Sequence, residues 1–326
     1  MKILIDIMHP ADVNFFKRAV QRLCTEHEIT IWVRDRGKLK EIATEEFNLP
    51  IRSIGRHYSS VWGKFFSAFQ RIGNLLRHCR KNSYDVLTSF GGYHIGIVAK
   101  LTGQHAVVFY DDYEYRLNFL LGFIFSSSYV IPSSLCFSTP KVSTYYGFKE
   151  WAYLQNFTPV EDICNRYQLK KKAYVFIRHV ASTSLNYRHQ NYRDLIIDIV
   201  KFFEKRHIHV LMSVEDKKIK KYLPGTHFVQ EPCKEIHSLI YYAACTISSG
   251  DTVARESALL SVPTFYIGNR KMRVNGPLID AGLLKHTPGD TVFNALKKCM
   301  DSNERINLTF SWDDTTEVIV RHLLNR

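Results

Sequence analysis

Short apolar runs alternate along the chain with longer segments whose apolar positions recur every three or four residues. Near the N-terminus, apolar runs at residues 2–7 and 29–33 flank a segment of helical period at about residues 15–26. Strand, helix and strand in this order predict a βαβ unit and hence a parallel sheet. The alternation recurs at residues 84–110 and again from residue 173 onwards, so the pattern predicts two α/β domains.

The stretch of residues 245–267 carries the most informative pattern. Residues 245–248 are typical of the end of a buried strand, residues 254–260 of a helix, and residues 264–267 of another strand. Pro263 helps to end the helix before the second strand begins. Small and capping residues form the loop between the first strand and the helix: Ser248, Ser249, Gly250 and Asp251.

This loop offers chemistry for binding an anion. A helix N-terminus presents free N–H groups and the positive end of the helix dipole. Gly250 lets the backbone approach a phosphate closely, and the hydroxyls of Ser248 and Ser249 add donors. About one turn further, Glu256 is placed to accept hydrogen bonds from a ribose diol, and Arg255 to pair with a phosphate or with Glu256. An ordinary capped helix between two core strands would have the same spacing.

The same stretch resembles the nucleotide-sugar signature of GT-B-fold enzymes. It is most similar to an uncharacterised prokaryotic family of predicted GT-B-like glycosyltransferases, related to UDP-GlcNAc 2-epimerases and the peptidoglycan GlcNAc transferase. The chain keeps much of that family's pattern: Thr252, Ala254, Arg255, Glu256, Ala258, Leu259, Leu260, Val262 and Pro263. It has Ser249-Gly250-Asp251 where the family tends to glycines and Ser261 where the family has glycine, and a carboxylate at Asp251 would repel a diphosphate.

The resemblance implies a GT-B fold, with two Rossmann-like α/β domains whose parallel sheets face a cleft. Residues 1–160 would form the acceptor and catalytic domain, residues 170–310 the nucleotide-sugar-binding domain, and residues 311–326 a last helix that crosses back to the first domain. A basic loop after the strand at residues 173–177 is expected to grip phosphate. The residues expected to bind the donor are Arg178, Ile236, His237, Ser248, Ser249, Gly250, Thr252, Arg255 and Glu256.

In the first domain, polar residues follow the strands at the edge where ligands of parallel sheets gather. A loop at residues 8–14 follows the first strand and carries His9, Asp12 and Asn14. It resembles the start of the same family, although Asp12 and Asn14 stand where that family has histidines. A loop cap is the ordinary role for His9. Gly91 and Gly92 follow a later strand and would let the chain pass closely over a bound acceptor.

An acidic run, Asp111-Asp112-Tyr113-Glu114, follows the strand at residues 106–110. Close carboxylates raise one another's pKa and serve as acid or base, although a solvated acidic turn has the same composition. In the resembled epimerases and glycosyltransferases an acidic residue follows the corresponding strand. The candidates for a catalytic base are therefore Asp12, His9, Asp112 and Glu114.

The function that the resemblance implies is metal-independent transfer of a sugar from a nucleotide sugar, UDP-linked, to a glycan or lipid-linked acceptor in cell-surface polysaccharide synthesis. No cofactor is expected, because the nucleotide sugar is the substrate. Two alternatives stay open. The acidic run favours a nucleotide-sugar 2-epimerase, and the departures at Asp12, Asn14 and Asp251 favour a nucleotide-sugar-binding protein without turnover.

Composition indicates which binding partners and which cellular compartment to expect. The chain has 326 residues and a formal charge of +13, which suits anionic partners. No aromatic RNA-binding signature or zinc-finger spacing supports nucleic acid. Seven scattered cysteines without a CxxC pair indicate reduced thiols in a cytoplasmic protein. The N-terminal strand argues against a signal peptide, and the uncharged segment 117–140 is expected to be a buried strand and loop.

Residues 61–81 have the pattern of a basic amphipathic helix. Phe65, Phe66 and Phe69 lie close to cations at Lys64, Arg71 and Arg77. Such a helix could touch an anionic membrane surface, and the protein would then be peripheral on the inner face of the membrane. A helix packed on the core with a solvated basic face would show the same pattern.

Overall fold

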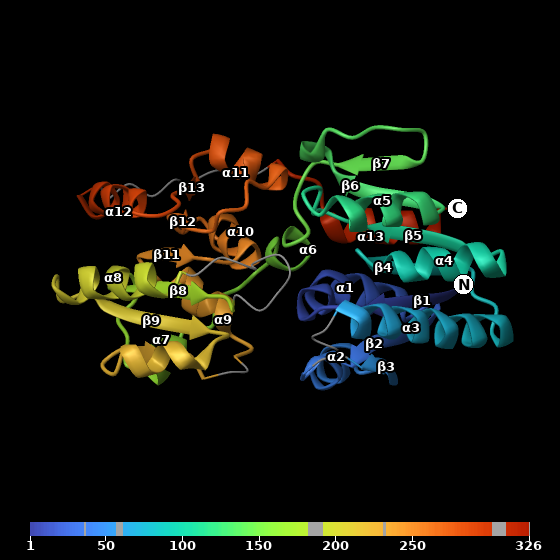
Figure 1. Cartoon of the computed structure of the whole chain (residues 1–326), viewed down its shortest axis with the longest axis horizontal. Coiled ribbons are helices and arrows are strands. Elements are labelled where there is room, and N and C mark those ends of the chain that lie inside the picture. Colours follow the sequence, from blue (N-terminus) through green and yellow to red (C-terminus); the bar gives the residue numbers. More distant parts are fainter. Residues whose placement is uncertain (36, 57–60, 182–191, 231–232, 302–310, 326) are drawn as a thin grey trace. The chain divides into compact units, whose positions relative to one another are not determined.

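The computed structural model describes residues 1–35, 37–56, 61–181, 192–230, 233–301 and 311–325. The chain forms two compact units (Figure 1). Unit 1 comprises Met1–Gln155, Met272–Val274 and Ser311–Arg326, and unit 2 comprises Asn156–Lys271 and Asn275–Phe310. Each unit is built on a parallel sheet with helices in the connections, which confirms the predicted fold class.

The described part of unit 1 contains a seven-stranded sheet in the order β3-β2-β1-β4-β5-β6-β7. Its strands are β1 (Lys2–Ile7), β2 (Glu28–Asp35), β3 (Ile51–Arg56), β4 (Val86–Phe90), β5 (His105–Phe109), β6 (Ser128–Pro132) and β7 (Val142–Tyr145). All neighbouring pairs are parallel. The strand order reverses between β1 and β4, which makes their carboxyl ends the place where a ligand of such a sheet is expected.

Two groups of helices cover this sheet. The first group packs around α1 and consists of α1 (Pro10–Leu23), α2 (Leu39–Phe47), α6 (Trp151–Leu154) and α13 (Thr315–Leu324). The second group consists of α3 (Val61–Lys81), α4 (Tyr93–Thr102) and α5 (Arg116–Phe125), and α4 contacts both of its neighbours. Right-handed crossovers in opposite directions from the reversal point place the two groups on opposite faces.

The described part of unit 2 contains a six-stranded parallel sheet in the order β10-β9-β8-β11-β12-β13. Its strands are β8 (Tyr174–His179), β9 (His209–Val214), β10 (His227–Phe228), β11 (Cys245–Ser248), β12 (Thr264–Tyr266) and β13 (Leu284–His286). Its helices are α7 (Ile163–Arg166), α8 (Arg193–Glu204), α9 (Ile236–Tyr241), α10 (Asp251–Leu259), α11 (Gly276–Asp280) and α12 (Thr291–Asp301). Here the strand order reverses between β8 and β11.

Two segments differ from the sequence-based expectation. The helix expected from about residue 15 begins at Pro10, because proline suits the first helical position and His9 and Asp12 cap the N-terminus. Segment 117–140 was expected to be strand and loop, but it includes most of α5, followed by β6. The expectation was wrong because α5 is apolar on its outward side as well, which hides its period. Within the described residues, no helix is long and apolar enough to cross a membrane.

A buried ion pair ties the crossover helix α3 to the sheet of unit 1. Arg71 is 2% exposed and its guanidinium pairs with the carboxylate of Asp6, which is fully buried at the end of β1. The same guanidinium donates to the carbonyl of Ile54 in β3 at 2.6 Å. In the membrane-surface interpretation of residues 61–81, Arg71 would face anionic lipid; that placement is wrong, because a buried carboxylate holds Arg71 inside, as in the alternative of a helix packed on the core.

We expect Asp6→Asn to destabilise the protein strongly, because it leaves the guanidinium of Arg71 buried without a counter-charge. The cost should be about 3–5 kcal/mol in the free energy of unfolding, measured by urea denaturation. Glu317→Gln is the matched control, because it breaks an ion pair with Arg22 in which both side chains are more than half exposed. That control should cost less than about 1 kcal/mol. Equal costs would show that the Asp6–Arg71 pair does not hold the fold.

Candidate functional site

Two serines brace the loop between β11 and α10. The Ser248 hydroxyl donates to the Gly250 carbonyl at 2.7 Å and accepts from the Gly250 N–H at 3.1 Å. The Ser249 hydroxyl accepts from the N–H of Val180 at 3.0 Å and donates to the carbonyl of Arg178 at 3.4 Å. Both serines are fully buried. These hydroxyls were expected to donate to a phosphate, but their protons are used inside the protein, so the serines shape the loop.

Gly250 is the N-cap residue of α10, so the N-cap position itself offers no side chain to cap this helix. A Cβ atom at Gly250 would lie 2.6 Å from Cγ1 of Val180, in the loop that follows β8. Glycine is therefore required by the close approach of two loops at the reversal point of the sheet. The first N–H groups of α10 point along the helix axis and make this end of α10 suitable for an anion.

An ion pair compensates the charge of Asp251 at the start of α10. Its Oδ2 lies 2.8 Å from Nη1 of Arg270, and both side chains are largely buried. The sequence suggested that this carboxylate would repel a diphosphate. Arg270 reduces that repulsion, because the two charges nearly cancel at a distance. Thr252, the next residue of α10, is half-buried.

Glu256 and His237 come together from two helices. Nε2 of His237 in α9 lies 3.1 Å from Oε1 of Glu256 in α10, and α9 and α10 pack against each other. The side chain of Glu256 is 8% exposed and that of His237 is 15% exposed. Ile236 is half-buried at the first position of α9. The structure thus brings together two residues that were predicted separately as donor-binding.

Two arginines expected to bind phosphate are engaged inside unit 2. Arg255 is 1% exposed and its guanidinium donates to the side chain of Asn275 at 3.3 Å, so a role in gripping phosphate is not supported. Arg178, at the end of β8, donates to the Ser213 hydroxyl at 2.5 Å and pairs with Glu215 at 2.6 Å. Its side chain is 17% exposed, so it also contributes mainly to holding the loops together.

In unit 1, His9 and Asp12 form a capping box at the N-terminus of α1. Nδ1 of His9 accepts from the N–H of Ala11 at 3.2 Å, which is the loop-cap role that the sequence left open for it. Oδ2 of Asp12 accepts from the N–H groups of Met8 and His9 at 3.1 and 2.8 Å. Asn14 is half-buried on the second turn of α1. Asp12 and Asn14 are therefore held on a helix instead of in the predicted loop.

The pKa of the Asp12 carboxyl group lies near neutral pH. Burial raises the pKa of Asp12 from 3.8 to about 7, although the Lys149 charge and the two backbone N–H groups oppose this rise. Nζ of Lys149 lies 3.3 Å from Oδ2 of Asp111, and both side chains are nearly buried. The Asp111 carboxylate in turn adds to the increase in the pKa of Asp12. Such a carboxyl group suits proton transfer at neutral pH.

Sequence reasoning named Asp111 only as part of the acidic run and gave Lys149 no role. Lys149 stands 37 positions beyond Asp112 in the chain, so no local pattern connects it with the acidic run. Its ammonium also lies 4.7 Å from the ring centroid of Phe90 at the end of β4. The cluster at the reversal point thus consists of Asp12, Asp111 and Lys149.

The other two acidic candidates have local structural partners. Oδ1 of Asp112 accepts from the N–H of Tyr115 at 3.1 Å, which closes a turn before α5. Oε1 of Glu114 accepts from the N–H of Arg273 at 3.0 Å and so anchors the segment Met272–Val274 on unit 1. These contacts favour structural roles for Asp112 and Glu114, and they leave Asp12 as the strongest candidate for a base.

Close packing inside unit 1 explains why residues 91 and 92 are glycines. Gly91 has φ +69°, and a Cβ there would lie 2.8 Å from the ring of Tyr110. A Cβ at Gly92 would lie 2.7 Å from the hydroxyl of Ser89. Both glycines were expected to allow an acceptor to approach, but the close neighbours of these positions are side chains of unit 1 itself.

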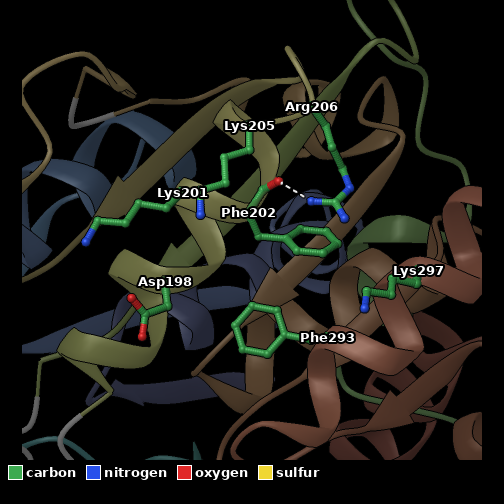
Figure 2. A pocket seen from close by; sticks show the side chains of 7 residues that line it. All are labelled: Asp198, Lys201, Phe202, Lys205, Arg206, Phe293 and Lys297. Carbon is green, nitrogen blue, oxygen red and sulfur yellow. Dashed lines mark hydrogen bonds between the residues drawn. The ribbon is translucent and has the colours of Figure 1, made fainter.

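Unit 2 also has a basic groove away from the β11–α10 loop. It has a volume of about 490 Å³ and lies near the C-terminal end of α8 and along α12. Figure 2 shows its lining side chains, which combine four cations, one carboxylate and two aromatic rings: Asp198, Lys201, Phe202, Lys205, Arg206, Phe293 and Lys297. Because α8 connects two parallel strands, this end lies toward the amino edge of the sheet, opposite the β11–α10 loop.

Comparison with known proteins agrees with the fold. A family model described as "Protein of unknown function (DUF354)" matches residues 135–326. No curated protein matches the chain. The structure of UDP-N-acetylglucosamine 2-epimerase from Rickettsia bellii is similar with a TM-score of 0.79 and 13% identity, covering 99% of this chain and 96% of that one.

Two further solved structures show the same architecture. MnaA from S. aureus, solved with UDP, has a TM-score of 0.76 and 14% identity, covering 98% of this chain and 95% of that one. The spinosyn rhamnosyltransferase SpnG has a TM-score of 0.61 and 13% identity, with 93% and 90% covered. At these identities the likeness shows the fold, which an epimerase and a rhamnosyltransferase share.

The raised pKa of Asp12 predicts a pH-dependent stability. The folded-state pKa lies above the ordinary value of 3.8, so the contribution of Asp12 to stability is full below about pH 4 and is lost as the pH rises through about 7. Asp12→Asn removes this loss. Relative to the unmodified protein, the variant should gain about 2–3 kcal/mol between pH 5 and pH 8 in urea unfolding. Asp198→Asn, at an exposed position of α8, controls for loss of a carboxylate. A pH-independent difference for Asp12→Asn would contradict the assignment.

Proposed function

The chain belongs to the family described as protein of unknown function (DUF354), and we propose that it is a glycosyltransferase that takes its sugar from a UDP-linked donor. The single observation that carries the proposal is the pairing of Glu256 with His237 on a helix whose N-cap residue is a glycine. The acceptor is proposed to be a glycan or a lipid-linked sugar. The donor is assigned to unit 2 and the general base to unit 1.

The β11–α10 loop supplies two complementary groups for a nucleoside diphosphate. The N–H groups and dipole of α10 suit the diphosphate, and they are held in place by the buried Ser248 and Ser249. Glu256 lies further along the same helix, and its carboxylate suits a pair of ribose hydroxyls. Nε2 of His237 lies beside that carboxylate, 3.1 Å from Oε1. The arrangement is preorganised, because hydrogen bonds inside the protein already hold the loop.

The transfer step places a proton on Asp12. An acceptor hydroxyl oxygen forms a bond to the anomeric carbon while the bond from that carbon to the diphosphate oxygen breaks. The electron pair leaves with the nucleoside diphosphate, and the hydroxyl proton passes to the carboxylate of Asp12. A pKa of about 7 suits both accepting and releasing that proton near neutral pH. Donors at the N-terminus of α10 would stabilise the leaving charge, so we propose that turnover persists in EDTA.

A second candidate function is epimerisation of a nucleotide sugar at C2. Two observations favour it: the likeness to structures described as UDP-GlcNAc 2-epimerases, and the buried acidic cluster of Asp12 and Asp111. An epimerase needs groups that remove and return a proton on the sugar, and the acceptor would then be dispensable. Asp112 and Glu114 support this candidate less, because backbone N–H groups occupy their carboxylates.

We expect Glu256→Gln to weaken UDP binding about ten- to a hundredfold, because the amide keeps the shape but loses the charge that accepts the ribose hydrogen bonds. Isothermal titration with UDP measures the effect. Glu204→Gln is the matched control, because Glu204 is exposed in α8 of the same unit. If Glu256→Gln and the unmodified protein bound UDP equally well, Glu256 would not be a ribose ligand.

Incubation with UDP-GlcNAc in D₂O separates the two candidate functions. Without an acceptor, the transferase proposal predicts that NMR shows no C2 epimer and no deuterium at C2. When the sugar of the donor is isotopically labelled and a lipid extract is added, the label should move from the donor into the lipid fraction. Asp12→Asn should lower that transfer at least about a hundredfold while leaving UDP affinity nearly unchanged. Formation of the C2 epimer without acceptor would overturn the transferase proposal in favour of the epimerase.

A further inference from the structure

One face of unit 1 is apolar and positively charged. The three helices that cover this face, α3, α4 and α5, contain no aspartate or glutamate, although acidic residues make up about a tenth of the chain. They contain seven lysines or arginines, five of them in α3 and one each in α4 and α5. Of these, Arg71 is buried. By contrast, α2 alone, in the group around α1, has three glutamates.

Large apolar side chains lie exposed on the same three helices. Their exposed fractions range from 46% to 71%, and they are Phe66 and Phe69 in α3, Leu101 in α4, and Leu117, Leu120 and Ile124 in α5. The positions in α5 recur at helical spacing, so they form one outward stripe. A soluble surface rarely concentrates so many apolar side chains unless something covers them.

The three helices form a continuous surface. Figure 1 shows α3, α4 and α5 in succession along unit 1, and α4 contacts both neighbours. A Cβ at Gly96 of α4 would lie 2.8 Å from the backbone of Phe125, so α4 and α5 pack closely. On α3, burial of Ser67, Arg71 and Leu75 turns the opposite side outward, and that side carries Phe66, Phe69, Arg77 and Arg80.

We propose that this face of α3, α4 and α5 binds the surface of an anionic bilayer. Apolar side chains would enter the boundary between headgroups and acyl chains, while cations pair with anionic lipids. Compared with the surface expected from the sequence, the proposed membrane-binding surface still includes Phe66 and Phe69. It excludes Arg71, which is buried, and it adds exposed residues of α4 and α5. The side chains of Lys64 and Phe65 lie outside the described residues.

Charge argues against a second copy of the chain as the occupant. In a symmetric dimer the same face meets itself, so the cations of α3, α4 and α5 would oppose one another without a carboxylate from these helices. An anionic bilayer supplies the missing negative charge. The inference rests on the exposure and charge of unit 1 and stands apart from the assignment of the donor.

Co-sedimentation with vesicles tests the proposal on the full chain. Vesicles of phosphatidylcholine mixed with phosphatidylglycerol should bind the protein at low salt, and pure phosphatidylcholine vesicles should bind it at least about tenfold more weakly. Leu117→Ser with Leu120→Ser should lower binding about tenfold or more without lowering the melting temperature, because both positions are exposed. Tyr222→Ser with Ile279→Ser is the apolar control, since both side chains are exposed in unit 2.

Two double variants distinguish the effect of positive charge on this face from the effect of the net charge of the whole protein. Arg80→Glu with Lys100→Glu should lower binding about tenfold, whereas Lys201→Glu with Lys205→Glu, in the basic groove of unit 2, should leave it within about twofold. Equal losses in the two pairs would show that net charge alone attracts the vesicles, and would overturn the proposal. It would also be overturned by absence of binding at low salt, or by a dimer in solution that Leu117→Ser with Leu120→Ser dissociates.

Discussion

The buried ion pair between Asp6 and Arg71 is the interaction on which unit 1 depends most. Burying either charge alone would be costly, so the pair commits α3 to one rotation against the sheet. Because Arg71 also donates to the carbonyl of Ile54, it joins β1 and β3 to the helix that crosses between β3 and β4. That rotation turns Phe66 and Phe69 outward. One interaction therefore shapes both the reversal point of the sheet and the outer face of the unit.

In unit 2, hydrogen bonds and ion pairs hold the loop between β11 and α10 in place. Most polar side chains around the β11–α10 loop are occupied by partners inside the unit: Ser249 by the loop after β8, Arg178 by Ser213 and Glu215, and Asp251 by Arg270. What such a framework leaves for a ligand is the N-terminus of α10 and the slightly exposed pair of Glu256 and His237. A loop held in this way loses little conformational entropy when a ligand binds.

The sequence predicted the α/β architecture because strands and helices alternate with different periods, and the segment 245–267 was assigned to nearly its true elements. It failed at α5, where outward apolar residues concealed the helical period. It also failed at Arg71, because its partner Asp6 lies 65 positions away and only the fold brings them together. Glu256 and His237 could be proposed as donor-binding residues from the chain alone, since both lie in segments that follow strands. Their pairing, and the position of Lys149 beside Asp111, depend on packing that no local pattern records.

Hydrogen exchange at the start of α10 tests most directly the claim that this protein takes a nucleoside diphosphate sugar. The first N–H groups of an α-helix lack partners within the helix, so the amides of residues 251–253 should exchange quickly in the free protein. A diphosphate bound there would accept hydrogen bonds from them. The account predicts that UDP slows exchange at these amides at least about tenfold, with protection also in α9 around His237. Unchanged exchange there, together with protection at the basic groove of α8 and α12, would contradict it.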